Sequence, residues 1–171
     1  MRPVQNAFTN GPEIRICPVK RLYQLLEIQD CSGWGAIISS TSPVDMEKLK
    51  KLPYVFRQYA DVDYECPGRS FSQEDAAAFA GFLDGLSGGQ RILYCCCDAG
   101  ESRSPAVAAA VLRYFGRDDL AIWENPRYHP NMLVFDMLMR QLGAELPDEE
   151  KDTLLYINHK AFADAIKAAR K

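Results

Sequence analysis

Apolar residues follow two alternating patterns along the chain, which predict strands and helices in turn. Four short apolar runs bounded by turn residues predict strands at residues 13–17, 34–40, 54–62 and 91–97. Between and after them, apolar residues recur at helical spacing, which predicts helices at residues 18–28, 41–52, 69–89, 104–116, 130–142 and 148–170. Strands that alternate with helices favour an α/β fold, with a central, mainly parallel sheet of about four to five strands and helices on both faces.

Capping residues refine where two of these helices begin. Ser42 precedes Pro43, and Asp45 follows the serine by three positions, so we expect Ser42 to cap a helix that begins at Pro43. Ser70 or Ser72 can cap the helix that follows the third strand. In a sheet of this kind ligands bind beyond the carboxyl ends of the strands, so the loop after residues 91–97 is the first place to look for a site.

Composition narrows the functional classes. The 171 residues fit one domain over residues 1–171, and 47% hydrophobic with 25% charged residues is typical of a globular protein. A net charge of -3 without a basic block argues against nucleic-acid binding. No apolar run is long enough to span a membrane and no secretion signal is evident, so we expect a cytoplasmic monomer with no membrane partner.

Six cysteines call for a choice between a disulfide framework, a metal site and free thiols. Without a secretion signal, free or catalytic thiols are favoured over disulfides. There is no Cys-x-x-Cys pair, and His129 and His159 are not in a ligand-spaced cluster, so we expect no metal. No cofactor-binding motif is apparent either, and the expected chemistry is that of the side chains alone.

The loop after the fourth predicted strand carries the clearest chemistry. From Cys97 it reads CDAGESRS: a cysteine, five residues, Arg103 and then Ser104. A short turn before a helix N-terminus can point its backbone N–H groups inward and form an anion-binding cradle. Gly100 allows the backbone angles that a tight cradle needs. Arg103 can bind two oxygens of a tetrahedral oxyanion at once.

This arrangement makes Cys97 the candidate nucleophile. The loop amides, the helix dipole and Arg103 favour its thiolate form, and Ser104 can hydrogen-bond the sulfur and help it leave. Asp98 and Glu101 would oppose a thiolate if they pointed inward, so we expect both side chains to face outward. The predicted backbone N–H ligands of a phosphate are those of Asp98, Ala99, Gly100, Glu101 and Ser102.

The segment CDAGESRS resembles the Cys-x-x-Gly-x-x-Arg-Ser/Thr phosphate loop of cysteine-dependent protein phosphatases, both tyrosine-specific and dual-specificity. More narrowly, the chain resembles small bacterial tyrosine-phosphatase-like proteins, through IRICPVKRL, YADV, this loop and HPNMLVFDMLMRQLG. The resemblance implies a phosphatase-like fold and hydrolysis of phosphomonoesters through a phospho-cysteine on Cys97, with Arg103 binding phosphate and no cofactor. It also implies an Asp some thirty-odd residues upstream that protonates the leaving group.

Two aspartates stand at a suitable distance for that role. Asp61 and Asp63 precede Cys97 by 36 and 34 positions. Asp61 matches the Asp of the family's Phe-x-Asp-Ile-like stretch, with Tyr59 and Val62 as apolar flanks, and we favour it. Asp63 begins the more flexible segment DYECPGRS and could do the same work, so it stays an alternative acid.

One departure from the family pattern leaves alternatives open. The family usually has His directly before the nucleophile, whereas this chain has Cys96, and a thiol is a weaker donor. A slow pseudophosphatase that only binds phosphate, or a thiol-based redox or arsenate-reductase-like enzyme, are therefore alternatives. The acidic loop favours a monophosphate ester, in a phosphorylated protein or a small molecule, over a polyanionic ligand.

Overall fold

A four-stranded, entirely parallel sheet forms the centre of the computed structural model, which describes residues 11–86 and 88–170. Its strands lie in the order β1-β4-β2-β3, so that β4 and β2 are the inner pair. Their bounds are β1 Glu13–Pro18, β2 Trp34–Ser40, β3 Tyr54–Gln58 and β4 Ile92–Cys97. The α/β fold class with a parallel sheet is thereby confirmed, at four strands.

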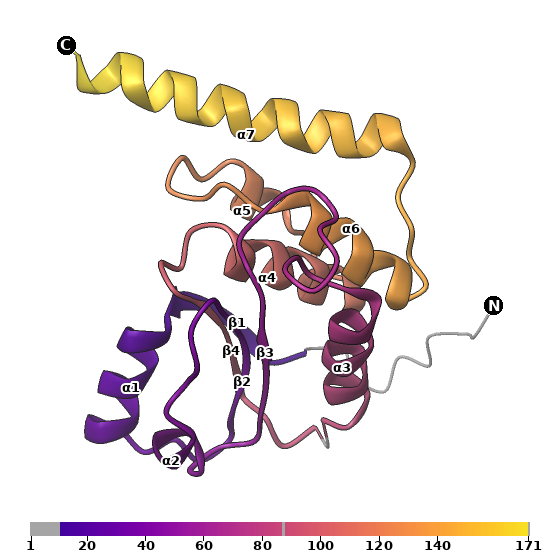
Figure 1. Ribbon diagram of the computed structural model, residues 1–171. Helices are drawn as coiled ribbons and strands as arrows, with labels where there is room; N and C mark the ends of the chain where they lie inside the picture. Colours follow the sequence, from indigo (N-terminus) through magenta and orange to yellow (C-terminus); the bar gives the residue numbers. More distant parts are fainter. Residues whose placement is uncertain (1–10, 87, 171) are drawn as a thin grey trace.

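Helices cover both faces of this sheet (Figure 1). On one face lie α1 (Val19–Ile28) and the single-turn α2 (Met46–Leu49). The other face is covered by α3 (Gln73–Asp84), α4 (Arg103–Tyr114), α5 (Leu120–Trp123) and α6 (Met132–Gln141). The long α7 (Asp148–Ala169) lies outside this layer and packs against α5.

Alternate side chains of β4 divide the core in two. Leu93 and Cys95 pack toward α3, α4 and α6, whereas Tyr94 and Cys96 pack toward α1 and α2. All four side chains are buried, as the unbroken apolar pattern of this strand predicts for a position at the centre of a parallel sheet. The strand therefore delivers Cys97 to the carboxyl edge of the sheet from a rigid, fully packed base.

Two elements differ from the sequence prediction. The helix expected from Pro43 begins only at Met46, because Asp45 caps it by accepting from the backbone N–H groups of Glu47 and Lys48. The cap expected at Ser42 was wrong. The third strand ends at Gln58 rather than residue 62, since the chain leaves the sheet there. Ser72, one of the two predicted caps of α3, forms a capping box with Asp75.

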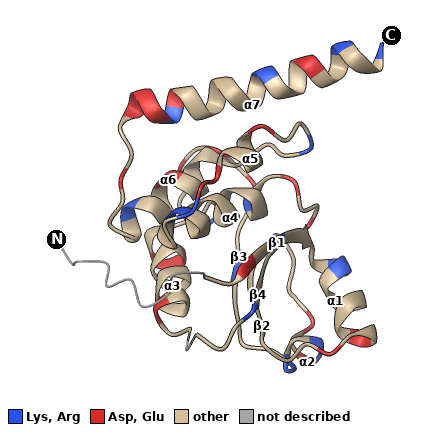
Figure 2. Ribbon diagram, turned by 180° about the vertical axis from the view of Figure 1, so that it is seen from behind, with Lys and Arg blue, Asp and Glu red and all other residues tan. Residues whose placement is uncertain are grey.

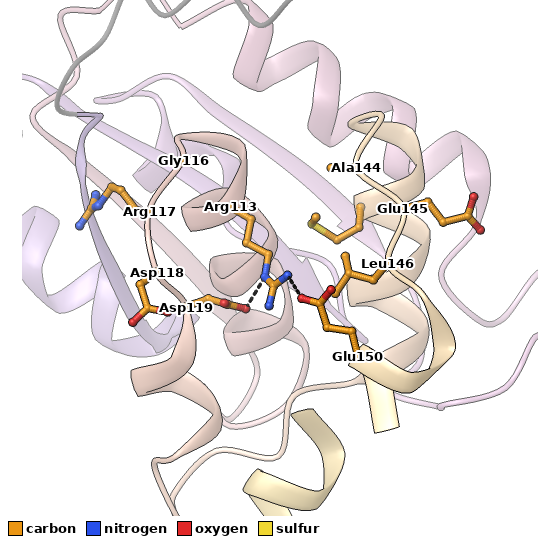
Figure 3. A pocket seen from close by; sticks show the side chains of 10 residues that line it. Arg113, Gly116, Arg117, Asp118, Asp119, Ala144, Glu145, Leu146 and Glu150 are labelled. Atoms are coloured by element: carbon orange, nitrogen blue, oxygen red, sulfur yellow. Dashed lines mark hydrogen bonds and ion pairs between the residues drawn. The ribbon is translucent and has the colours of Figure 1, made fainter. Parts of the chain in front are cut away.

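The start of α7 is tied to the body of the protein by Arg113 of α4 (Figure 3). Its guanidinium lies 2.9 Å from Asp119 and 2.7 Å from Glu150. Asp119 is almost fully buried and also accepts from the Trp123 indole. Acidic residues gather at the first turn of α7 and Lys167 lies in its last turn (Figure 2), which suits the helix dipole. Within the described part of the chain, no helix is long and apolar enough to cross a membrane.

Arg113→Ala should lower the free energy of unfolding by roughly 3 kcal/mol, because it leaves the buried Asp119 carboxylate without its cation. Urea denaturation followed by circular dichroism measures the change. Arg140→Ala is the matched control, because Arg140 is 55% exposed and Asp136 keeps its pair with Lys151 at 2.9 Å, so the loss should be less than about 1 kcal/mol. Equal losses in the two variants would contradict the role given to Arg113.

Candidate active site

The candidate site is the tight loop that joins β4 to α4 at the carboxyl edge of the sheet. Gly100 lies in the left-handed region with φ of 76°. A Cβ added there would lie 2.9 Å from the backbone nitrogen of Pro18 and 3.0 Å from the carbonyl carbon of Cys17. Both the backbone angle and this close approach require glycine. The loop is consequently braced against the end of β1.

Cys97 lies at the bottom of this loop with its side chain 2% exposed. The Ser104 hydroxyl is 3.0 Å from its sulfur, and the backbone N–H of Gly100 donates to the same sulfur at 3.2 Å. The structure thus brings together Cys97, Gly100 and Ser104, as the spacing in the sequence predicts. Two polar groups that can stabilise a sulfur anion surround an otherwise buried thiol.

Arg103 occupies the first turn of α4 and is also buried, at 4% exposed. Its Nη1 donates to the Tyr59 carbonyl at 2.8 Å and to Thr41 Oγ1 at 3.1 Å. Its Nη2 donates to Asp98 Oδ2 at 2.6 Å. The guanidinium is therefore held by the residues directly after β2 and β3 and by its own loop. The sequence offered no signal for the contacts with Thr41 and Tyr59.

Asp98 stays out of the cradle, as expected, with its side chain 43% exposed, but it is bound to neighbouring residues rather than free in solvent. Its carboxylate accepts from Ser40 Oγ at 2.6 Å and from the Thr41 backbone N–H at 3.0 Å, in addition to Arg103. Partial burial works to raise the pKa of Asp98, but the hydrogen bonds from Ser40, Thr41 and Arg103 outweigh it and lower that pKa to about 2. Glu101 is exposed as well, as expected.

Of the two candidate acids, Asp61 is the one placed against the loop. Its Oδ1 accepts from Ser102 Oγ at 2.8 Å and from Asn131 Nδ2 at 2.9 Å. Its Oδ2 lies 3.8 Å from Arg103 Nε. Asn131 caps α6, as the sequence predicts, but its bond to Asp61 could not be found from the sequence because 70 positions separate the two.

Asp63 and Asp61 both line a cavity of about 800 Å³ next to the loop. This cavity lies between the segment after β3, the start of α6 and the middle of α7. Its lining side chains include Asp61, Asp63, Tyr64, Ser102, His129 and His159. The cavity adjoins the candidate acid and is large enough for the organic part of a phosphate ester.

Cys96, which stands where the resembling family has His, turns away from this site. Its sulfur lies 3.6 Å from that of Cys17, its register partner on β1, within the core under α1. Burial raises the pKa of the Cys96 thiol well above its ordinary value. Among the residues that the structure describes, no group of His, Cys, Asp and Glu could hold a metal ion.

Cys96→Ala should leave kcat/KM for an aryl phosphate within about threefold of wild type, because the change is confined to core packing on the far face of β4. Steady-state rates of variant and wild type are compared, and their melting temperatures are measured to show that the variant is folded. A loss above tenfold in a variant that is still folded would mean that Cys96 supports the nucleophile after all.

Comparison with known proteins finds only distant likeness. No family model matches the chain, and no curated protein matches it. Solved structures similar to it include PTPMT1 in complex with PI(5)P, at 14% identity and a TM-score of 0.45, over 90% of this chain and 94% of that one. Tk-PTP in its active form has 16% identity and a TM-score of 0.42, over 93% and 99%.

A third similar structure is the core catalytic domain of the PP-IP phosphatase SIW14 from S. cerevisiae, at 11% identity and a TM-score of 0.41, over 84% of this chain and 85% of that one. At these identities and TM-scores, the functional conclusion depends on the site itself.

Proposed function

We propose that the protein is a cysteine-dependent phosphomonoesterase that acts on phosphotyrosine or a similar aryl phosphate through a phospho-cysteine on Cys97. The observation that carries the proposal is the buried Cys97 sulfur, with Gly100 N–H and Ser104 Oγ on it, at the base of a loop whose Arg103 is fixed in place. We expect residues 1–171 to form a single domain and the protein to be a monomer.

In the first step the Cys97 thiolate attacks phosphorus and the ester oxygen leaves with its bonding electrons. Arg103 and the loop N–H groups bind the equatorial oxygens, where negative charge gathers in the transition state. Asp61 donates a proton to the leaving oxygen, so that an alcohol or phenol departs rather than an anion. Its position between Ser102 and Arg103 supports this assignment.

In the second step water hydrolyses the phospho-cysteine. Asp61, now a carboxylate, accepts a proton from the water as it attacks phosphorus. The S–P bond breaks and the electron pair returns to the sulfur, where the Ser104 hydroxyl at 3.0 Å can donate a hydrogen bond to the thiolate. Inorganic phosphate is released and the free enzyme is restored without a metal or an organic cofactor in any step.

The charge of the loop supports a monophosphate ester as substrate. Asp98 and Glu101 stand between Cys97 and Arg103, and the loop holds no cation other than Arg103. A second phosphate group on the substrate would meet repulsion from these carboxylates.

Hydrolysis of a chromogenic aryl phosphate, compared with phosphotyrosine peptides and a phosphoinositide headgroup, tests the proposal. The aryl ester and the phosphotyrosine peptides should be hydrolysed. Acid quenching during turnover should trap phosphate bound covalently to the sulfur of Cys97. Phosphate binding without turnover would instead identify a phosphate-binding module. Reduction of arsenate in place of ester hydrolysis would identify a thiol-based reductase.

A further inference from the structure

We propose that Asp98 is a positioning residue: its carboxylate holds one edge of the Arg103 guanidinium so that the other edge faces the phosphoryl group. This role rests on the proposed function, because it is defined by the binding of phosphate. Asp98 is the residue directly after the nucleophile, and a carboxylate at that place is at first sight unfavourable for an anion site.

The hydrogen bonds of Arg103 show which of its donors are engaged. A guanidinium carries five N–H donors in one plane. Nη1 uses its two on the Tyr59 carbonyl and Thr41 Oγ1, and Nη2 uses one on Asp98. This leaves Nε–H and the second N–H of Nη2, which point in parallel from the same edge. Nε is buried and has no hydrogen-bond partner among the described residues.

The same contacts show which edge is free. Thr41 Oγ1 accepts from Nη1, and the backbone N–H of Thr41 donates to the Asp98 carboxylate that binds Nη2. Thr41 thus lies beside both terminal nitrogens of the guanidinium. Asp98 and Thr41 therefore cover the edge formed by Nη1 and Nη2. The opposite edge carries Nε, which lies 3.8 Å from Asp61 Oδ2 and so faces the candidate acid. Two parallel N–H donors are the geometry that binds phosphate bidentately.

The carboxylate of Asp98 is itself fixed to the sheet. Ser40 Oγ, at the end of β2, donates to its Oδ1 at 2.6 Å, while Oδ2 accepts from Thr41 and Arg103. A group held this way by three donors is anchored, not free to enter the cradle as a competing anion. With a pKa of about 2, it is charged throughout the pH range in which enzymes are ordinarily assayed.

Two effects of Asp98 on phosphate binding oppose each other. Its negative charge repels a phosphate, but its side chain is 43% exposed, so that water and salt screen this repulsion. Without Asp98, Nη2 loses its acceptor and the guanidinium is held through Nη1 alone, so its free edge is no longer fixed for two parallel bonds to phosphate. A bidentate charge-assisted pair is the stronger interaction, so orientation should outweigh repulsion.

Inorganic phosphate binding, measured by calorimetry and as competitive inhibition, tests this role together with kcat and KM for an aryl phosphate. Asp98→Ala should raise the Kd of phosphate by about tenfold or more and lower kcat/KM at least as much, with Asp98→Asn between it and wild type. Glu101→Gln removes the same charge from the same loop without a bond to Arg103, and should bind phosphate slightly more tightly.

Arg103→Lys shows whether Asp98 acts through the guanidinium. Lysine cannot present a fork, so the effect of Asp98→Asn on phosphate binding should shrink to less than about twofold in this background. If Asp98→Ala lowers the melting temperature, Thr41→Val provides the second test, because it removes the other acceptor on the same edge and should also weaken phosphate binding.

The outcomes separate the two proposals. Tighter or unchanged phosphate binding in folded Asp98→Ala would show that Asp98 competes with phosphate or is a bystander, and would overturn its positioning role. An undiminished effect of Asp98→Asn in the Arg103→Lys background would also overturn it. A wild-type protein that neither binds phosphate nor hydrolyses aryl esters would instead refute the proposed function.

Discussion

Cys97→Ser should reduce the hydrolysis of a chromogenic aryl phosphate by at least about 10³-fold while the protein still binds inorganic phosphate. A serine hydroxyl at this place keeps its proton at neutral pH and is a far weaker nucleophile than a thiolate. The cradle should survive, because Gly100 stays braced against Pro18 and Arg103 keeps its contacts with Tyr59 and Thr41. Catalysis and binding should therefore separate in this one variant.

Initial rates and acid-quenched phosphoenzyme report the first effect, and calorimetry with inorganic phosphate reports the second. Cys31→Ser is the matched control, since it removes one thiol at a partly exposed position, whose sulfur donates to the backbone carbonyl of Lys51. It should keep wild-type activity. A Cys97→Ser protein with more than about a tenth of wild-type activity would show that another group attacks phosphorus.

Signals that act over short distances along the chain predicted most of the fold. The continuous apolar run of β4 follows from burial on both faces, and the capping box of α3 follows from Ser72 and Asp75 alone. The start of α2 was placed wrongly because two good caps, Ser42 and Asp45, stand three residues apart and the sequence does not rank them. Ser42 instead donates its backbone N–H to Ser40, inside the turn that leaves β2.

The candidate site was predictable to the extent that it is one loop. Cys97, Gly100, Arg103 and Ser104 are neighbours in sequence, so their spacing describes their geometry. The orientation of Asp98 was not predictable, because it depends on Ser40, 58 positions away. The sequence prediction for Asp98 considered only its charge, whereas the hydrogen-bond donors of Ser40 and Thr41 at the end of β2 decide where its side chain points.

The choice between Asp61 and Asp63 is settled by a pair of single variants. Asp61→Asn should lower kcat/KM by about 10² to 10³-fold for phenyl phosphate, because no proton then reaches a poor leaving group. For an ester with a good leaving group, such as nitrophenyl phosphate, the loss should be much smaller, since that oxygen departs as an anion unaided. The asparagine keeps an oxygen for the bonds from Ser102 and Asn131, so the segment after β3 should hold its place.

Asp63→Asn is the matched partner of this experiment. Asp63 lies two residues further along and, unlike Asp61, forms no hydrogen bond or ion pair with Ser102 or Arg103, so its variant should keep rates within about threefold for both esters. The decisive quantity is the ratio of the two esters' kcat/KM values, because a structural disturbance lowers both rates alike and only a lost proton donor makes them diverge. If this ratio shifts in Asp63→Asn and not in Asp61→Asn, the acid is Asp63, and the bonds of Asp61 to Ser102 and Asn131 serve only to hold the segment after β3 in place.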